Sequence, residues 1–296
     1  MLGPVSSHAA AETRQVVASL GSQPTVAGHS GDHPPDLETL RANPSRLPRI
    51  LIQGTMARVT EMSAADQLVS AIRTGDVDAV ERLLASDAGL ALSPLGGTHD
   101  TRTPLHVVAD WPGYFPNGAQ IVRILIAAGG DPNARDPGKP SETPLHWAAS
   151  SDDVDVARAL IDGGADINLP DGSIGTPLDN AIGYGCWNVA RLLAERGARV
   201  EKMWHAAALG MVDRLQELVP GHPNGDTEEL SQAFWHACAA GQRRAAEFLL
   251  GEGANLNWIP AYAEGTPLDA ARGLGTQQQN VISWLRERGA RTDQAE

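Results

Sequence analysis

Apolar residues recur at helical spacing in paired short segments along most of the chain. One such stripe comprises Val154, Val156, Ala157, Leu160 and Ile161. This spacing predicts an amphipathic helix with a single buried face. Gly163 and Gly164 follow directly and predict its end, because glycine readily adopts the left-handed conformation found after helices. A helix this short cannot bury its stripe alone, so we expect its stability to come from packing against its neighbours.

The paired segments begin with a recurring sequence box. Four copies are Thr103-Pro-Leu-His106, Thr143-Pro-Leu-His146, Thr176-Pro-Leu-Asp179 and Thr266-Pro-Leu-Asp269. Aligning the later alanines and glycine adds three divergent starts, at Asp66, Glu201 and Gln232. In each box the threonine suits a helix N-cap and the proline suits the first helical position. We therefore predict an all-α repeat solenoid of about seven helix-turn-helix units with short finger loops.

The ends of the units also repeat, which allows the family to be named. They read Gly130-Asp-Pro-Asn133, Gly164-Ala-Asp-Ile-Asn168 and Gly253-Ala-Asn-Leu-Asn257. With the Thr-Pro-Leu-His box, they make the chain resemble ankyrin repeats, whose unit has about 33 residues. The resemblance covers roughly residues 64–292. It implies a stacked array of helix pairs, in which His106 and His146 are structural hydrogen-bonding groups.

The first 60 residues differ from the rest. Six prolines are scattered among Gly, Ser and His without a sustained apolar period, so we expect this segment to be disordered. In an alternative interpretation, Met56 is the true start. The predicted domains are thus an N-terminal segment, 1–60, and a repeat domain, 61–296, with units starting near 66, 103, 143, 176, 201, 232 and 266.

Charge and composition exclude several classes of partner. The net charge is −13; residues 1–60 hold four acidic and five basic residues, which leaves 32 acidic and 18 basic residues and a net charge of −14 for the rest. Such an acidic body repels phosphate backbones, so we expect no nucleic acid partner. No apolar run approaches the length of a membrane span. Cys186 and Cys238 are too few for a disulfide framework, and we expect a cytoplasmic monomer.

The sequence offers little catalytic or metal-binding chemistry. His205 and His236 occur in matching Trp-His-Ala contexts in adjacent units. We interpret both as packing residues; a shared metal is the alternative, but two histidines are too few for a zinc site. The chain has neither a nucleophile elbow nor a phosphate-binding loop. We expect no cofactor, no metal and no enzymatic activity.

The resemblance also implies where a partner binds. Ankyrin ligands contact the finger tips and the exposed surface of each first helix. The matching positions here are His99, Asp100, Arg102, Asp110, Trp111, Lys139, Glu142, Ser150, Ser151, Ser173, Tyr184 and Tyr262, to which we add the insert aromatics Tyr114 and Phe115. Aromatic residues often anchor interfaces. In the inserted segment 111–118 the rings either face a partner or pack inward, and both arrangements remain open. The shortened junction at 196–201 is expected to interrupt the groove.

Three functions are compatible with this pattern. The leading hypothesis is a non-catalytic scaffold or regulatory adaptor that binds a protein through the concave ankyrin surface. A second is small-molecule binding, or an unrecognised enzymatic role, that uses the 111–118 insert. A third, based on acidity alone, is an inhibitor or immunity-type partner of a basic enzyme.

Overall fold

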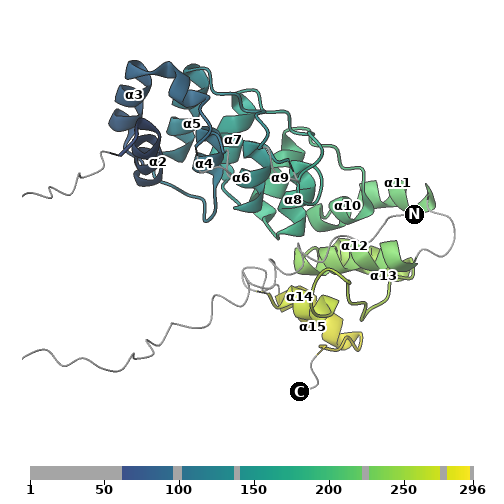
Figure 1. The fold of residues 1–296 in the computed structure, drawn as a ribbon. Coiled ribbons are helices and arrows are strands. Elements are labelled where there is room, and N and C mark those ends of the chain that lie inside the picture. The colour runs from purple at the N-terminus through teal and green to yellow at the C-terminus, as the bar shows by residue number, and fades with distance from the viewer. Residues whose placement is uncertain (1–61, 96–101, 137–140, 222–226, 274–278, 294–296) are drawn as a thin grey trace, which may run out of the picture. The chain divides into compact units, whose positions relative to one another are not determined.

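The computed structural model describes residues 62–95, 102–136, 141–221, 227–273 and 279–293. Within these residues fourteen α-helices follow one another as seven pairs; Figure 1 shows their order along the chain. The first helices of the pairs are α2 (Ala64–Thr74), α4 (Pro104–Ala109), α6 (Pro144–Ser150), α8 (Pro177–Gly183), α10 (Met203–Leu209), α12 (Thr227–Ala239) and α14 (Pro267–Ala271). The second helices are α3 (Val77–Ser86), α5 (Gly118–Ala127), α7 (Val154–Asp162), α9 (Trp187–Glu195), α11 (Val212–Leu218), α13 (Arg243–Gly251) and α15 (Gln279–Glu287). This arrangement confirms the predicted all-α repeat fold.

The third pair illustrates why these residues form helices. Thr143 is the N-cap of α6 and Pro144 occupies its first position, as the box predicts. The Thr143 backbone N–H donates to Nδ1 of His146 (3.2 Å), and the same nitrogen pairs with the threonine hydroxyl (2.8 Å). The Asp153 carboxylate caps α7 by accepting from the backbone N–H of Val156 (3.1 Å). Gly164 ends the unit with a φ of 98°, which favours glycine.

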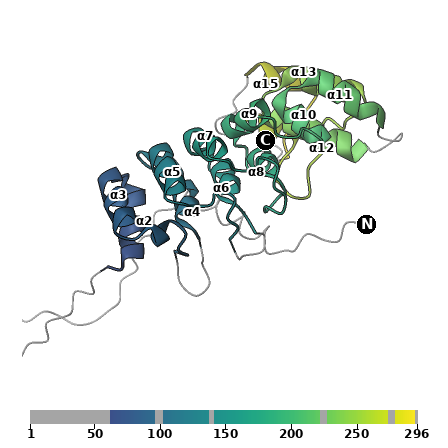
Figure 2. The ribbon, with the colours of Figure 1, turned by 90° about the horizontal axis from the view of Figure 1, so that it is seen from above.

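Successive units pack through their small and aliphatic faces. In the chain-order stack, α2 packs on α4, α4 on α6, α6 on α8, and α10 on α12 (Figures 1 and 2). Ala148 and Ala149 are completely buried, which lets neighbouring first helices approach closely. The buried apolar residues form two clusters, one from Leu68 to Ala208 and one from Met203 to Leu285. Helix α10 contributes to both clusters and therefore joins them.

The divergent units stack with the others, although their boundaries are irregular. Asp66 lies in the first turn of α2, and Glu201 lies two residues before α10. Gln232 lies inside α12, which begins at Thr227. Helix α10 contacts both α8 and α12, and α12 contacts α14. The three weakly patterned segments are thus part of the same array.

The last helix presents a polar outer surface. Val281, Trp284 and Leu285 of α15 are buried, while Arg286, Glu287 and Arg288 are exposed. A polar outer face is what a terminal repeat needs, because no further unit covers it. Among the helices described, none combines the length and apolar character needed to cross a membrane. The N-terminal segment 1–60, expected to be disordered, lies outside the described residues. The description begins at residue 62, just before α2.

Candidate functional site

The two box histidines connect each unit to the next. The imidazole Nε2–H of His106 donates to the carbonyl of Glu142, and that of His146 donates to the carbonyl of Gly175, both at 3.1 Å. Their Nδ1 atoms accept from the N-cap backbone of their own helices. Burial lowers the pKa of both imidazoles, so they remain neutral. They have the structural role that the family resemblance implies.

Asp179 occupies the equivalent box position in the fourth unit. Its Oδ2 accepts from the backbone and hydroxyl of Thr176 (2.7 and 2.8 Å). Its Oδ1 accepts from Nζ of Lys202 and from Nε2 of His205, the latter at 2.8 Å. Burial alone would raise the pKa of this carboxyl group, but the hydrogen bonds from His205 and Lys202 hold it well below its ordinary value. Asp179 is therefore a buried carboxylate paired with two basic side chains.

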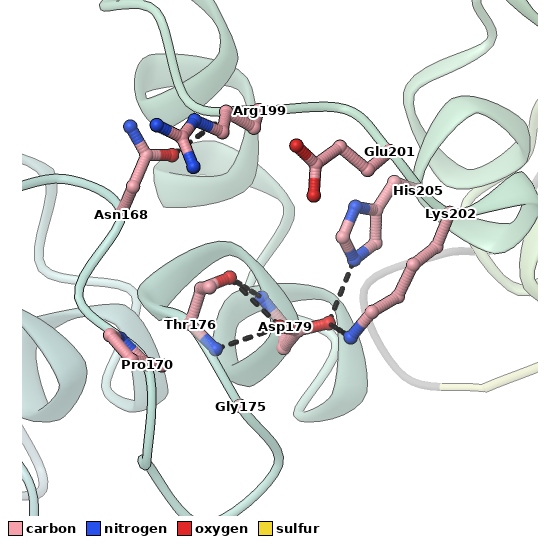
Figure 3. A pocket seen from close by; sticks show the side chains of 9 residues that line it. All are labelled: Asn168, Pro170, Gly175, Thr176, Asp179, Arg199, Glu201, Lys202 and His205. Carbon is pink, nitrogen blue, oxygen red and sulfur yellow. Dashed lines mark hydrogen bonds and ion pairs between the residues drawn. The ribbon is translucent and has the colours of Figure 1, made fainter.

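A pocket of about 240 Å³ opens beside this cluster (Figure 3). It lies at the shortened junction between α9 and α10, where the sequence lacks a full finger. The lining residues are Asn168, Pro170, Gly175, Thr176, Asp179, Arg199, Glu201, Lys202 and His205. A small pocket lined by charges of both signs thus lies at the junction where the sequence predicts an interruption of the groove.

His205 and His236 have different partners. Nε2 of His205 donates to Asp179, whereas Nε2 of His236 pairs with the hydroxyl of Tyr262 at 3.1 Å. The Trp204 ring stacks on His236, with ring centroids 5.1 Å apart. Burial, with a smaller contribution from the field of His205, lowers the pKa of His236 to about 3. No group of three or more His, Cys, Asp or Glu side chains in the described residues is arranged to hold a metal. Each of the two histidines thus bonds to a partner of its own.

The 111–118 insert presents two aromatic rings to solvent. Trp111 is 70% exposed and Tyr114 is 61% exposed, whereas Phe115 is half-buried. The insert is nevertheless held in place, because the Tyr114 backbone N–H donates to the Asp153 carboxylate (2.6 Å) and its hydroxyl donates to the Asp152 carbonyl. A shallow pocket of about 380 Å³ lies between the insert and α7. The insert is docked on the next unit while its outer rings face solvent.

A second exposed aromatic group lies near the finger between the third and fourth units. Tyr184 is 49% exposed, and its hydroxyl pairs with that of Ser173 at 3.3 Å. The carboxylate of Glu142 accepts from the Ser173 backbone and from the Asn180 side chain, both at 2.8 Å. Asn180 also reaches the Ser150 hydroxyl. The structure therefore brings these predicted binding residues together and uses their polar groups to fix the finger.

The remaining predicted positions are divided between paired, exposed and undescribed residues. Arg102 donates to Asp110 at 2.9 Å, and Ser151 donates to the Ala109 carbonyl at 3.2 Å. Tyr262 is exposed at its ring, while its hydroxyl accepts from Gln232. His99, Asp100 and Lys139 lie outside the described residues.

Sequence reasoning missed the cluster of Asp179, Lys202 and His205, and it also missed the exposed Ile174, whose side chain lies against Gly183. A signal for the cluster was present. The histidine of the box is replaced by aspartate at 179, just where the following junction is short. A carboxylate at a position that reaches the next unit requires donors from that unit.

These features define a class of protein, the repeat array of stacked helix pairs whose box residues bond to the next unit. Residues 113–203 match the family described as Ankyrin repeats (3 copies). The chain is an ankyrin-repeat protein. Ankyrin repeats generally mediate protein–protein interactions, and the matched family is typically non-catalytic.

Individual relatives are diverse. The chain is 36% identical over 81 residues to the E3 ubiquitin-protein ligase KEG of Arabidopsis thaliana, covering 27% of this chain and 5% of that protein. It is 30% identical over 187 residues to the Neurogenic locus Notch protein of Drosophila melanogaster, covering 54% of this chain and 7% of that protein. It is 28% identical over 178 residues to the human Ankyrin repeat and SOCS box protein 16, covering 46% of this chain and 38% of that protein. The chain thus matches well under two thirds of the length of each.

Proposed function

We propose that this protein is a non-catalytic adaptor that binds another protein through the exposed surface of its first helices and fingers. One observation carries the proposal: Trp111, Tyr114 and Tyr184 are all about half exposed or more, yet each lies on a segment fixed by packing or hydrogen bonds. Rigid, exposed aromatic side chains bind partners at low entropic cost. The partner is proposed to be a protein, not a nucleic acid or a membrane.

The state of the potentially reactive side chains supports a non-catalytic role. Burial raises the pKa of the Cys186 thiol to about 12 and raises that of Cys238 further, so neither is a thiolate at neutral pH. His106 and His146 use both ring nitrogens in structural contacts. Both cysteines are free, which fits the further proposal of a monomer in a reducing cytosol.

The test is affinity capture from cells of the source organism, followed by titration of the purified partner. The Trp111→Ala/Tyr184→Ala variant is expected to weaken binding at least tenfold, because it removes two exposed anchors. Leu92→Ala is the matched control. Leu92 is 57% exposed and is the C-cap of the short 3₁₀ helix η2 (Ala88–Ala91), so it is distant in sequence from Trp111 and Tyr184. Equal affinity of the double variant and the control would refute the proposed surface.

Small-molecule binding is a second candidate, favoured by the pocket beside the insert. A metabolite panel screened by thermal shift tests it, because a ligand that binds the native state raises its stability. If no compound raises the melting temperature, this candidate is rejected. The inhibitor hypothesis rests on charge alone and requires an association that weakens strongly with salt.

A further inference from the structure

A ladder of side-chain to backbone hydrogen bonds links the ends of consecutive units. An asparagine Oδ1 accepts from a backbone N–H of the following unit in three places. The pairs are Asn133 with Asp166 (2.7 Å), Asn168 with Arg199 (2.9 Å) and Asn257 with Arg291 (2.8 Å). Each asparagine therefore satisfies a donor that a neighbouring finger supplies at this position.

Glu201 occupies the same position in the fourth unit. It follows Arg199 by two residues, just as Asn168 follows Asp166, and it lies 33 residues after Asn168. Later in the chain, the backbone N–H of Asn255 donates to the Ser231 hydroxyl of its own unit (2.8 Å). Within the described residues the Glu201 carboxylate has no hydrogen bond or ion pair, and the residue is exposed. At Glu201 the ladder is thus interrupted by a carboxylate to which no described residue donates.

A second acceptor without a donor lines the same pocket. His205 donates its Nε2–H to Asp179, so Nδ1 is the ring nitrogen left to accept a hydrogen bond. This Nδ1 is buried and has no partner, and the His205 side chain is only 3% exposed. In Figure 3 the Nδ1 edge of the ring faces the side of the pocket that holds the Glu201 carboxylate. A buried acceptor without a partner is costly, so a donor brought to this place is favoured.

The charges around the pocket favour a cationic donor. Asp179 already pairs with Lys202, which neutralises that ammonium group. The four charged lining residues, Asp179, Glu201, Arg199 and Lys202, sum to zero, so the pocket itself does not repel a cation. The chain as a whole has a net charge of −13 and attracts one. An anion would be repelled by the negative charge of the chain and would face two hydrogen-bond acceptors, the Glu201 carboxylate and Nδ1 of His205.

We propose that this pocket binds an arginine side chain of the protein partner. The planar guanidinium group carries five N–H donors and binds carboxylates in a bidentate manner. It can therefore donate to the Glu201 carboxylate and to Nδ1 of His205 at the same time. In the proposed complex the exposed Glu201 side chain turns with the bound group, which brings an N–H donor to the buried nitrogen. The inference rests on the proposed function in one respect: the arginine belongs to the bound protein. It adds a contact separate from Trp111 and Tyr184.

The pocket can be tested without the partner. The full chain, labelled with ¹⁵N in its histidines, is titrated at pH 7.5 with N-acetyl-arginine methylamide while the imidazole resonances are recorded by NMR. We expect the Nδ1 resonance of His205 to move saturably, because that atom gains a donor. His236 is an internal control, since its Nδ1 is also buried without a partner but lies outside the pocket. The neutral isostere N-acetyl-citrulline methylamide is expected to cause no saturable change.

Two variants sharpen the test. Glu201→Gln is expected to weaken binding of the arginine probe about tenfold, because it removes the charged acceptor. Glu287→Gln, the same change on the exposed face of α15, is expected to leave affinity unchanged. The inference is overturned if His205 shows no saturable shift up to about 50 mM probe, a concentration far above millimolar dissociation constants. It is also overturned if citrulline binds equally or if both variants behave alike. None of these results would affect the capture experiment with Trp111 and Tyr184, so the two proposals fail separately.

Discussion

At the scale of single residues, one box position performs the same task with two chemistries. Where histidine occupies it, as at His106, a neutral imidazole bonds to a finger carbonyl of the next unit. Where aspartate occupies it at 179, the next unit supplies Lys202 and His205 instead. The histidine role could be predicted from the box. The aspartate cluster could not, because its donors come from a shortened junction whose path the helical pattern does not specify.

The two box aspartates provide a direct comparison. Asp179→Asn is expected to lower the free energy of unfolding by about 2 kcal/mol, because it leaves Lys202 and His205 facing a neutral amide; we take less than the usual cost of breaking a buried pair, since Lys202 is partly exposed. Asp269→Asn is the matched control. Asp269 bonds to Thr266 in the same way but has no Lys or His donor among the contacts described. Urea unfolding of both variants measures the difference, and equal losses would contradict the role of the cluster.

At the scale of elements, the helices could be predicted from apolar spacing, whereas the placement of the insert could not. Periodicity gives no information on a loop such as 111–118. Its position depends on Tyr114 and Asn117, both with φ near 57°, and on contacts to units on either side. Asn117 donates to the Gly75 carbonyl at 2.9 Å, while Tyr114 bonds to the turn before α7. The two arrangements left open by the sequence are thus combined: the backbone docks and two rings remain exposed.

A glycine beneath the insert tests this docking. A Cβ atom at Gly75 would lie 2.4 Å from the Pro116 carbonyl oxygen, and Gly75 has a φ of 70°. Gly75→Ala is therefore expected to cost about 3 kcal/mol, from left-handed strain and a backbone clash together. Gly197→Ala has the same kind of strain, with a φ of 94°, but a Cβ there meets nothing within 4 Å. Its expected cost is about 1 kcal/mol. Comparable denaturation midpoints for the two variants would show that the insert does not press on Gly75.

At the scale of the whole molecule, the family and the stacking order could be predicted because the same box and glycine turns recur. The strength of each junction could not, since it depends on which residues meet across it. The two apolar clusters join at α10, where Trp204 also stacks on His236 and Lys202 reaches back to Asp179. Buried polar groups are thus spread along the array, and a change in their protonation affects several units together.

The stability of the array should accordingly fall in mildly acidic solution. Burial lowers the pKa of His106, His146 and His236, the last from 6.5 to about 3. Below pH 6.5 the unfolded chain therefore binds protons that the folded chain does not, and each such site contributes up to about 1.4 kcal/mol per pH unit. The contribution of these three histidines to the free energy of unfolding is complete above pH 6.5. It is lost as the pH falls toward their pKa values in the folded chain. The low pKa of Asp179 adds a further loss only below its ordinary value of 3.8.

Urea midpoints at pH 7.5, 6.0 and 5.0 measure this effect in a range where most carboxylates stay ionised. We expect a progressive decrease in the free energy of unfolding. His236→Leu should flatten the pH dependence by one proton, because leucine keeps the apolar contact with Trp204 and cannot titrate, while Gln232 still donates to Tyr262. An exposed-site variant, Arg286→Gln, should keep the full slope, since Arg286 lies on the outer face of α15. A free energy of unfolding that is constant from pH 7.5 to 5.0 would mean that the buried histidines gain protons as readily as in the unfolded chain, and that the units are not closely packed around them.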